Sequence, residues 1–511
     1  MKRLIIGIVL TCLLVTVITP PIVSAEEALP LIDVNWFCVD NSAGSKSLNS
    51  DMEVWKELGV RNNMNIIIEA VPGSDFNQKF NLYLAGDSLP DVMQGGDIAR
   101  YGLEGAFVAL DDFIDSSAPS IKARLEESPA LASALRASDG KTYMISEYRP
   151  FPTTDPNPLI RVDWLENVNL EKPQTLDEWY TVLKAFKEND PNGNGENDEI
   201  PYSGFFGGVG NFTEFFLACG AYPDFYPNED GKYEYRYMLS NMKTCLEWLN
   251  KLYAEGLIDQ DIASNDQTLF DQKFDSNTVG VFRGYFFTSM INKNKLAETT
   301  IDGLKLEAVP PVIGPDGKSH VMRTPVSLSN YGITVSAQDP ERIVKLFDYM
   351  YSEDGILLTT MGIEGLTFEF TADGEPVYTD LILNNPEGMG AINALRTFGG
   401  LNGMPYIHTI PYRIGLYPEN LRETALSTYE AHEAVADMNP ITLAFTEDEV
   451  KENGTHMAEI NTYVNEMILK FIYGRESLDG FDAFVENIEK LGIAEVVANY
   501  QAAYDRLQGN S

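Results

Sequence analysis

Residues 65–93 read NIIIEAVPGSDFNQKFNLYLAGDSLPDVM and contain three segments of different character within 29 positions. The run 65–71 is rich in isoleucine and valine, which predicts a buried strand. Residues 76–84 predict a helix, and Asp91-Val92-Met93 predicts a second strand. An alternating order of strand and helix favours a largely parallel sheet with helices on its faces. This stretch therefore predicts an α/β fold.

The neighbouring segments continue the same order. Residues 31–39 (LIDVNWFCV) predict a first buried strand, and a helix follows from 52–58 with Ser50 or Asp51 as its cap. Further along, 106–114 and a helix over 120–135 extend this lobe, and 140–145 predicts a short strand. The proline-rich run RPFPTTDPNP at 149–158 then marks a first crossing between lobes. Because 511 residues exceed one ordinary core, we expect two or three lobes.

The remaining chain predicts a second set of strands and helices. Helices are expected over 176–188 and 240–255, with a strand over 279–282. Strands at 306–310 and 332–334 precede a helix over 340–352, which begins at a proline in a favourable position. The C-terminal part from about 446 is predicted to be mostly helical, with amphipathic pieces at 457–471 and 481–506.

The N-terminus has the pattern of a secretory signal peptide. Lys2 and Arg3 precede an apolar run over 4–18, and Val23-Ser24-Ala25 supplies the small residues of a cleavage site. We expect residues 1–25 to be removed after Ala25, leaving an exported, soluble protein. An uncleaved membrane anchor is the alternative, although the run is short for a bilayer span.

Cysteine usage gives no disulfide framework. Cys12 lies inside the apolar run and is expected to leave with the signal, and it lacks the context of a lipidation site. The other three, Cys38, Cys219 and Cys245, are an odd number. We expect buried free thiols, with a bond between Cys219 and Cys245 as the alternative.

The chain is strongly acidic, with a formal charge of −39 from 76 acidic and 37 basic residues. Binding to nucleic acid or to an anionic membrane needs clustered lysine and arginine, and the sequence has no such run. We therefore exclude nucleic acid as a partner. The charge also argues against a highly anionic ligand, unless a few local arginines override it.

Residues 190–199, DPNGNGENDE, have the spacing of an EF-hand loop. Oxygen-bearing side chains occupy the first, third and fifth positions, glycine permits a sharp turn at the sixth, and acids follow at the ninth and tenth. We predict a structural Ca²⁺ site, whose ligands are Asp190, Asn192, Asn194, Asp198 and Glu199 through side chains and Glu196 through its carbonyl. Pro201 occupies the twelfth position, so Glu199 would replace the usual bidentate glutamate. The alternative is a polar turn held by Asx hydrogen bonds.

Several segments, in order, resemble the extracellular solute-binding proteins of ABC importers. They are FNLYLAGDSLPDVM (80–93), GAFVALDDFID (105–115), DGKTYMI (139–145), the run from Ile160 to Pro201, and DPERIVKLFDYMYSEDG (339–355). The chain is most similar to the long-chain, oligosaccharide-binding subgroup with a calcium loop. The lipidation cysteine that many members carry is missing, so tethered, freely secreted and periplasmic forms all stay open.

The resemblance implies a two-lobed, periplasmic-binding-protein-like fold with discontinuous lobes and a hinged ligand cleft. We expect residues 26–150 and 306–400 to form the N-terminal lobe, and 151–305 and 401–511 the C-terminal lobe. It further implies an oligosaccharide ligand, an ABC permease in the membrane as partner, and a monomer outside the cell or in the periplasm. Three crossovers would form the hinge about which ligand closes the lobes.

Sugar sites combine flat aromatics for the ring faces with fixed polar groups for the hydroxyls. Such residues should follow strands or lie in loops that face the cleft. The candidates are Trp36, Tyr148, Phe206, Arg283, Tyr285, Phe286, Tyr331, Phe398, Tyr406 and Tyr412. For Trp36 a place in the core, and for Arg283 a structural salt bridge, are equally good interpretations.

A secreted glycoside hydrolase is the alternative function. It would need two carboxylates about 5–10 Å apart across a cleft, and 76 acidic residues make chance pairs inevitable. The sequence shows no nucleophile elbow and no HExxH motif, and its four histidines have no metal-site spacing. We therefore expect a binding protein and no enzyme. A sensor or adhesion protein of the same fold, and a peptide ligand, stay open.

Overall fold

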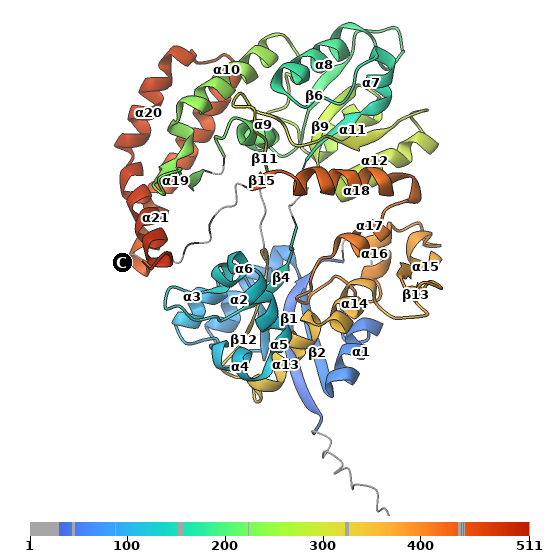
Figure 1. The fold of residues 1–511 in the computed structure, drawn as a ribbon, viewed down its shortest axis with the longest axis vertical. Helices are drawn as coiled ribbons and strands as arrows, with labels where there is room; N and C mark the ends of the chain where they lie inside the picture. The colour runs from blue at the N-terminus through green and yellow to red at the C-terminus, as the bar shows by residue number, and fades with distance from the viewer. Residues whose placement is uncertain are drawn as a thin grey trace, which may run out of the picture.

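The computed structural model describes residues 30–509 except 43–45, 87, 152–156, 223, 322–325, 438–440, 442 and 444. The predicted signal peptide 1–25, its cleavage site after Ala25 and part of the proline-rich crossing lie outside the described residues. Figure 1 shows two lobes, each built around its own sheet. Within the described residues, no helix has both the length and the apolar content that a membrane span requires.

The first lobe contains a five-stranded sheet in the order β2-β1-β3-β12-β4. β1 pairs in parallel with β2 and β3, whereas β12 is antiparallel to β3 and β4. The strands are β1 (Ile32–Asp40), β2 (Met64–Pro72), β3 (Val92–Gln94), β4 (Ile145–Tyr148) and β12 (Val326–Ile333). The strand–helix–strand order predicted for 65–93 is confirmed.

Helices cover both faces of this sheet (Figure 1). They are α1 (Glu53–Asn62), α2 (Gly73–Leu84), α3 (Ile98–Leu103), α4 (Asp111–Ser117), α5 (Pro119–Glu127), α6 (Pro129–Leu135), α13 (Pro340–Tyr351) and α14 (Glu353–Met361). The single helix predicted over 120–135 is wrong. Ser128 is extended and Pro129 starts a new helix, because the ring of a proline disfavours the helical conformation of the residue before it.

The second lobe contains a four-stranded sheet in the order β10-β5-β9-β6. β6 runs parallel to β9, while β5 is antiparallel to both β9 and β10. The strands are β5 (Asn157–Arg161), β6 (Ile200–Ser203), β9 (Val279–Gly284) and β10 (Leu306–Ala308). The expectation that 306 begins the return to the first lobe is wrong, because β10 bonds to β5. β12 is the strand that returns.

Ten helices of the described residues belong to the second lobe, two of which, α8 and α10, match the predicted positions within one residue. They are α7 (Val162–Val168), α8 (Leu176–Glu188), α9 (Thr213–Ala218), α10 (Ser240–Ala254), α11 (Gln267–Asp275), α12 (Phe286–Asn294), α18 (Glu419–Glu433), α19 (Glu447–Ile472), α20 (Phe481–Lys490) and α21 (Ile493–Leu507). The last predicted amphipathic piece is two helices, because Gly492 between them adopts φ 92°.

Short elements complete the chain. The hairpin β13 (Phe368–Phe370) and β14 (Pro376–Tyr378) precedes α15 (Asp380–Leu383), α16 (Ala391–Arg396) and α17 (Ile410–Gly415), and the second lobe adds β7 (Phe225–Pro227), β8 (Tyr233–Tyr235), β11 (His320–Val321) and β15 (Ala436–Asp437). Met404, Tyr406 and Ile407 pack in the core of the first lobe. The predicted transfer to the second lobe at 401 is therefore too early.

Each lobe has its own apolar core, and a third apolar cluster joins them. Trp36, Trp55 and Phe347 lie in the first core, and Trp164 and Trp179 lie in the second. The third cluster packs side chains of β9, α12 and α18 against residues of 361–417. The two lobes are therefore in apolar contact along one side.

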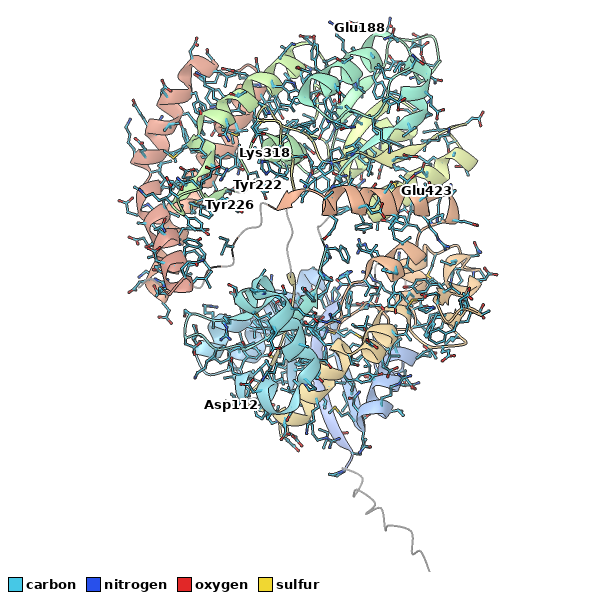
Figure 2. All side chains as sticks on the ribbon, viewed as in Figure 1. Asp112, Glu188, Tyr222, Tyr226, Lys318 and Glu423 are labelled. Atoms are coloured by element: carbon cyan, nitrogen blue, oxygen red, sulfur yellow. The ribbon has the colours of Figure 1, made fainter. Side chains whose placement is uncertain are left out.

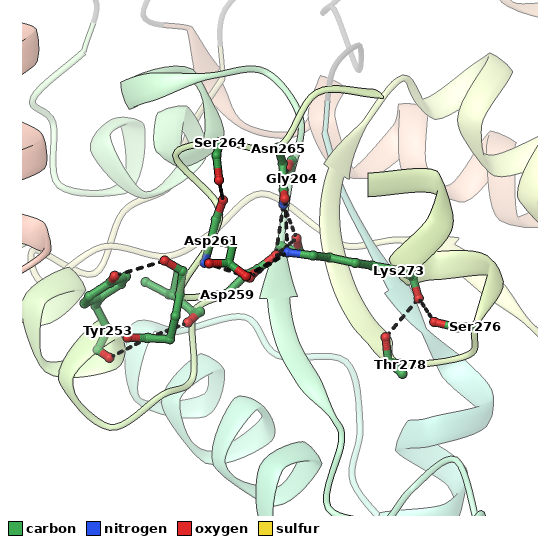
Figure 3. Close-up of polar contacts among 12 residues, drawn as sticks. Gly204, Tyr253, Asp259, Asp261, Ser264, Asn265, Lys273, Ser276 and Thr278 are labelled. Carbon is green, nitrogen blue, oxygen red and sulfur yellow. Dashed lines mark hydrogen bonds and ion pairs between the residues drawn. The ribbon is translucent and has the colours of Figure 1, made fainter. Parts of the chain in front are cut away.

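A buried ion pair fixes the end of β6 to α11 (Figure 3). Lys273 Nζ lies 2.8 Å and 3.0 Å from the two carboxylate oxygens of Asp259. Ser203 Oγ and Asn265 Nδ2 also donate to Asp259 Oδ2, at 2.7 Å and 2.9 Å. Burial opposes ionisation, but these donors outweigh it and hold the pKa of Asp259 below its ordinary value.

Candidate functional site

A cavity of about 450 Å³ lies where the two lobes meet. The first lobe contributes the end of β4, Tyr331 of β12 and the loop 401–409. The second lobe contributes Tyr285 and Thr288 at the start of α12. Two chain crossings run side by side along this wall, because Tyr148 N donates to Tyr406 O and His408 N to Tyr148 O. The cavity therefore lies beside the connections that a hinge would use.

Five tyrosines line this cavity. They are Tyr285, Tyr331, Tyr378, Tyr406 and Tyr412. Tyr285 is 46 % exposed and its ring packs edge-on against Phe206, with 5.4 Å between ring centroids. Tyrosine rings and hydroxyls together offer the apolar faces and hydrogen-bonding groups that a sugar requires. Four of these five, all except Tyr378, are among the residues that the sequence predicted.

Two predicted ligand residues are buried in the core, and their prediction is corrected. The Trp36 Nε1 donates to Gly403 O at 2.8 Å, and its ring packs against Trp55. Phe286 is fully buried between Tyr417 and Tyr429. Neither ring is part of the cavity lining, because Trp36 is surrounded by the core of the first lobe and Phe286 by the third apolar cluster.

The other four predicted residues lie outside the lining of this cavity. Tyr148 is buried and joins the two crossings through its backbone. Arg283 bonds Glu214 at 2.7 Å, and its guanidinium lies 4.8 Å from the centre of the Phe206 ring. The carbonyl of Phe398 accepts a hydrogen bond from Val54 N. The structural salt bridge considered for Arg283 is therefore present.

The sequence did not single out the charged and titratable groups of the cavity, namely Glu147, Arg149, Arg396, His408 and Arg413. Their signal is weak, since Glu147 and Arg149 lie at the start of the proline-rich crossing, Arg396 ends a short helix, and His408 and Arg413 fall in the irregular region 397–415. His408 Nε2 contacts Glu147 Oε1, and its Nδ1 lies 3.5 Å from Arg413 Nη1. Arg149 Nη2 lies 3.3 Å from Glu147 Oε1.

The environment keeps His408 neutral. Burial, together with the charges of Arg149 and Arg413, lowers the pKa of His408 to about 4 against the opposing effect of Glu147. The neutral ring then donates from Nε2 to Glu147 and accepts at Nδ1 from Arg413. These three side chains thus form one oriented row of hydrogen bonds along the cavity wall.

A second cavity, of about 600 Å³, lies in the second lobe. Tyr226, Arg236, Lys318 and His320 are among its lining residues. Figure 2 shows Tyr226 and Lys318 on the side of this lobe that faces the first lobe. Arg236 lies 5.0 Å from the centre of the Tyr226 ring and donates to Gly220 O at 2.6 Å. Tyr226 is the one tyrosine of this lining among the described residues, whereas the first cavity has five.

The loop 190–199 is a chain of Asx turns closed on its own oxygens. Asp190 carboxylate oxygens accept from Asn194 N at 3.1 Å and from Gly195 N at 3.0 Å. The amides of Asn192 and Asn194 both donate to Asp198. Across the described part of the chain, three or more His, Cys, Asp or Glu side chains do not converge as metal ligands. The Asx-turn alternative is therefore present in the geometry.

Glu199 is the exception within this loop. Its side chain is 2 % exposed, and neither carboxylate oxygen has a hydrogen-bond partner. Burial raises the pKa of Glu199, and the charges of Asp198 and Asp190 raise it further. A buried carboxylate without a donor is costly, and a hard cation is one group that would satisfy it. The predicted ligand set therefore fits Ca²⁺ at this position.

The sequence profile of the bacterial extracellular solute-binding protein family matches residues 47–356. The fructooligosaccharide ABC transporter substrate-binding protein FusA of Streptococcus pneumoniae serotype 4 is 25 % identical over 462 residues, which cover 86 % of this chain and 84 % of that protein. The polygalacturonan/rhamnogalacturonan-binding protein YtcQ of Bacillus subtilis is 25 % identical over 466 residues, covering 88 % and 87 %. The solved structure of the alginate-binding protein AlgQ2 without calcium ion superposes with a TM-score of 0.70 at 26 % identity, covering 93 % and 98 %.

Proposed function

The chain belongs to the family of bacterial extracellular solute-binding proteins, and from this premise we propose that it captures an oligosaccharide between its two lobes for an ABC importer. The observation that carries the proposal is the cavity at the meeting of the lobes, lined by tyrosines and fixed polar groups from both. The relatives reported above are named for binding fructooligosaccharide, polygalacturonan and alginate, which are all glycans. The ligand is delivered to a membrane permease.

The proposal includes no catalysis. Among the described residues that line the cavity, Glu147 is the one carboxylate, whereas glycoside hydrolysis uses a pair. Glu147 is also engaged by His408 and Arg149. The relatives are named as binding proteins, which gives the hydrolase alternative no support.

The protein works outside the cytoplasm in this proposal. It is exported by the segment 1–25, released by cleavage after Ala25, and acts as a monomer that presents its closed form to the permease. We assign residues 26–150 and the segment from β12 to Ile407 to the first lobe. The second lobe comprises residues 157–308 and the chain from α18 onward. The family description as extracellular supports this location.

A thermal-shift screen of the purified protein against a glycan panel tests the proposed function. A ligand that binds the folded state alone raises the melting temperature by mass action. We expect one glycan class to raise it and to be recovered intact. Shorter products in the same mixtures would make the protein a hydrolase, and a panel without any shift would contradict glycan capture.

We also propose that Ca²⁺ occupies the loop 190–199 and stabilises the second lobe. The ligands would be Asp190, Asn192, Asn194, Asp198 and Glu199 through side chains and Glu196 through its carbonyl. The unpartnered buried carboxylate of Glu199 supports this. At free calcium about 100-fold above Kd, binding would add about 2.7 kcal/mol to the free energy of unfolding.

Melting with calcium and with a chelator checks this prediction. The wild type should melt several degrees higher with calcium, and Glu199→Gln should lose that response. Glu188→Gln is the matched control, because Glu188 is an exposed carboxylate at the end of α8, just before the loop. Equal melting temperatures in calcium and in chelator would contradict the site.

A further inference from the structure

The charge of the main cavity is opposite to that of the protein. The whole chain has 76 acidic and 37 basic residues. Among the described residues of the cavity lining, three arginines, Arg149, Arg396 and Arg413, accompany the single carboxylate of Glu147. An arginine stays charged at any physiological pH, whereas His408 is neutral. The lining therefore carries a positive charge inside a protein whose surface repels anions.

Arg396 is the guanidinium best placed to receive an anion. It ends α16 and its Nη1 donates to the backbone carbonyl of Asn41 at 3.2 Å. Its Nε is buried and makes no hydrogen bond. In the part of the chain that the structure describes, no carboxylate oxygen lies within 4.0 Å of this guanidinium. The guanidinium thus lines the cavity with a neutral carbonyl as its partner, and the nitrogens beyond Nε can present N–H donors to a ligand.

The other two arginines of the lining, Arg149 and Arg413, both lie beside the pair of Glu147 and His408. Arg149 shares Glu147 with His408, and Arg413 approaches the remaining nitrogen of His408. One carboxylate is therefore divided between an arginine and a histidine. The one carboxylate among the described lining residues is thus already engaged, and Arg396 is the guanidinium of the lining that a carboxylate of the ligand would meet.

We propose that the preferred ligand is an acidic oligosaccharide whose sugars carry carboxylates, namely a uronate oligomer held by Arg396, with Arg149 and Arg413 in the same cavity lining. This rests on the proposed function and names its substrate class. A carboxylate accepts two parallel N–H bonds from a guanidinium, and such charge-assisted bonds are about twice as strong as bonds to a neutral hydroxyl. The tyrosines of the same cavity receive the sugar rings.

The acidic surface does not prevent this capture. Exposed charges are screened beyond about 8 Å at physiological ionic strength, so a ligand inside the cavity interacts mainly with its lining. The net charge of −39 instead slows the association of an anionic ligand with the protein. Salt also screens the contacts between the arginines and a bound carboxylate. The affinity for a uronate should therefore fall as the salt concentration rises.

Calorimetric titration with matched ligands tests the proposal. The probes are trigalacturonate, trimannuronate, the methyl ester of trigalacturonate, a neutral fructose-based trisaccharide and a sulfated disaccharide. The ester keeps the skeleton and removes the charge. We expect a uronate to bind at least about tenfold more tightly than the ester and the neutral sugar, which corresponds to about 1.4 kcal/mol.

The variants are Arg396→Gln and the control Arg100→Gln, which replaces an exposed arginine of the first lobe that forms surface ion pairs on α3. Arg396→Gln should weaken uronate binding by about tenfold or more, and Arg100→Gln should leave it unchanged. Should Arg396→Gln fail to fold, the affinities of the wild type for trigalacturonate and for its methyl ester still show whether the carboxylate is recognised.

The outcomes separate this inference from the proposed function. Tighter binding of the neutral sugar or of the ester would overturn the acidic ligand while leaving a glycan-binding protein. Binding of the sulfated sugar with no uronate binding would overturn the claim that the anionic group of the ligand is a carboxylate. Cleavage of a probe, or no response to any glycan, would overturn both proposals together.

Discussion

At the scale of single residues, the pair of Asp259 and Lys273 shows how burial turns a common ion pair into a structural requirement. Asp259 is almost fully buried, and Lys273 donates to both its oxygens. We predict that Lys273→Met lowers the free energy of unfolding by about 3 kcal/mol, because it leaves a buried carboxylate without its cation. Denaturation followed by tryptophan fluorescence measures the loss.

The control for this pair is Lys345→Met, which removes an exposed lysine bonded to the exposed Glu341. Surface ion pairs contribute little to stability, so this variant should have the same free energy of unfolding as the wild type. Because the pKa of Asp259 is lowered in the folded protein, its contribution is present above the ordinary pKa of about 3.9 and disappears as the pH falls through the folded value. The difference between Lys273→Met and wild type should therefore shrink below about pH 4, and a constant difference would contradict the assignment.

At the scale of elements, helix α8 shows why some boundaries follow from the sequence. Thr175 Oγ1 accepts from Glu178 N, and the Glu178 carboxylate accepts from Thr175 N, which is a complete capping box. We predict that Thr175→Ala costs about 1 kcal/mol of stability. Thr181→Ala on the same helix is the control, because Thr181 is exposed and bonds only the turn before it among the described contacts. Equal losses would show that α8 is held by packing alone.

Local signals of this kind predicted most elements but not their pairing. The helix predicted over 176–188 matches α8 to the residue, and the structure adds the capping box of Thr175 and Glu178, whose residues are close neighbours in the sequence. The three-residue strand β10 carries no information about its partner, so the sequence could not assign it to the second sheet. In the cavity, Tyr285 and Tyr331 were predictable because they accompany strands. Arg396 was not, because an arginine at a helix end is ordinarily solvated.

At the scale of the whole molecule, the two lobes have separate cores and are joined by the crossings and the third apolar cluster. The core of a lobe is close-packed and moves as a unit, so a ligand that contacts both walls of the cavity favours an arrangement in which the lobes approach. Tyr285 comes from the second lobe and Arg396 from the segment beside the first. Ligand binding should therefore change the distance between lobes and leave each lobe unchanged.

Labels on Asp112→Cys in the first lobe and Glu188→Cys in the second test this movement, since both positions are exposed at the far ends of the molecule (Figure 2). The native thiols Cys38, Cys219 and Cys245 are free and buried, so they should react slowly with the dyes. We predict that a bound glycan shortens the distance between these labels, measured by energy transfer. Labels on Glu188→Cys and Glu423→Cys, both in the second lobe, should report no change. A glycan that binds without altering the first distance would mean that the lobes are already closed, and that the apolar cluster between them holds the cavity in its final shape before ligand arrives.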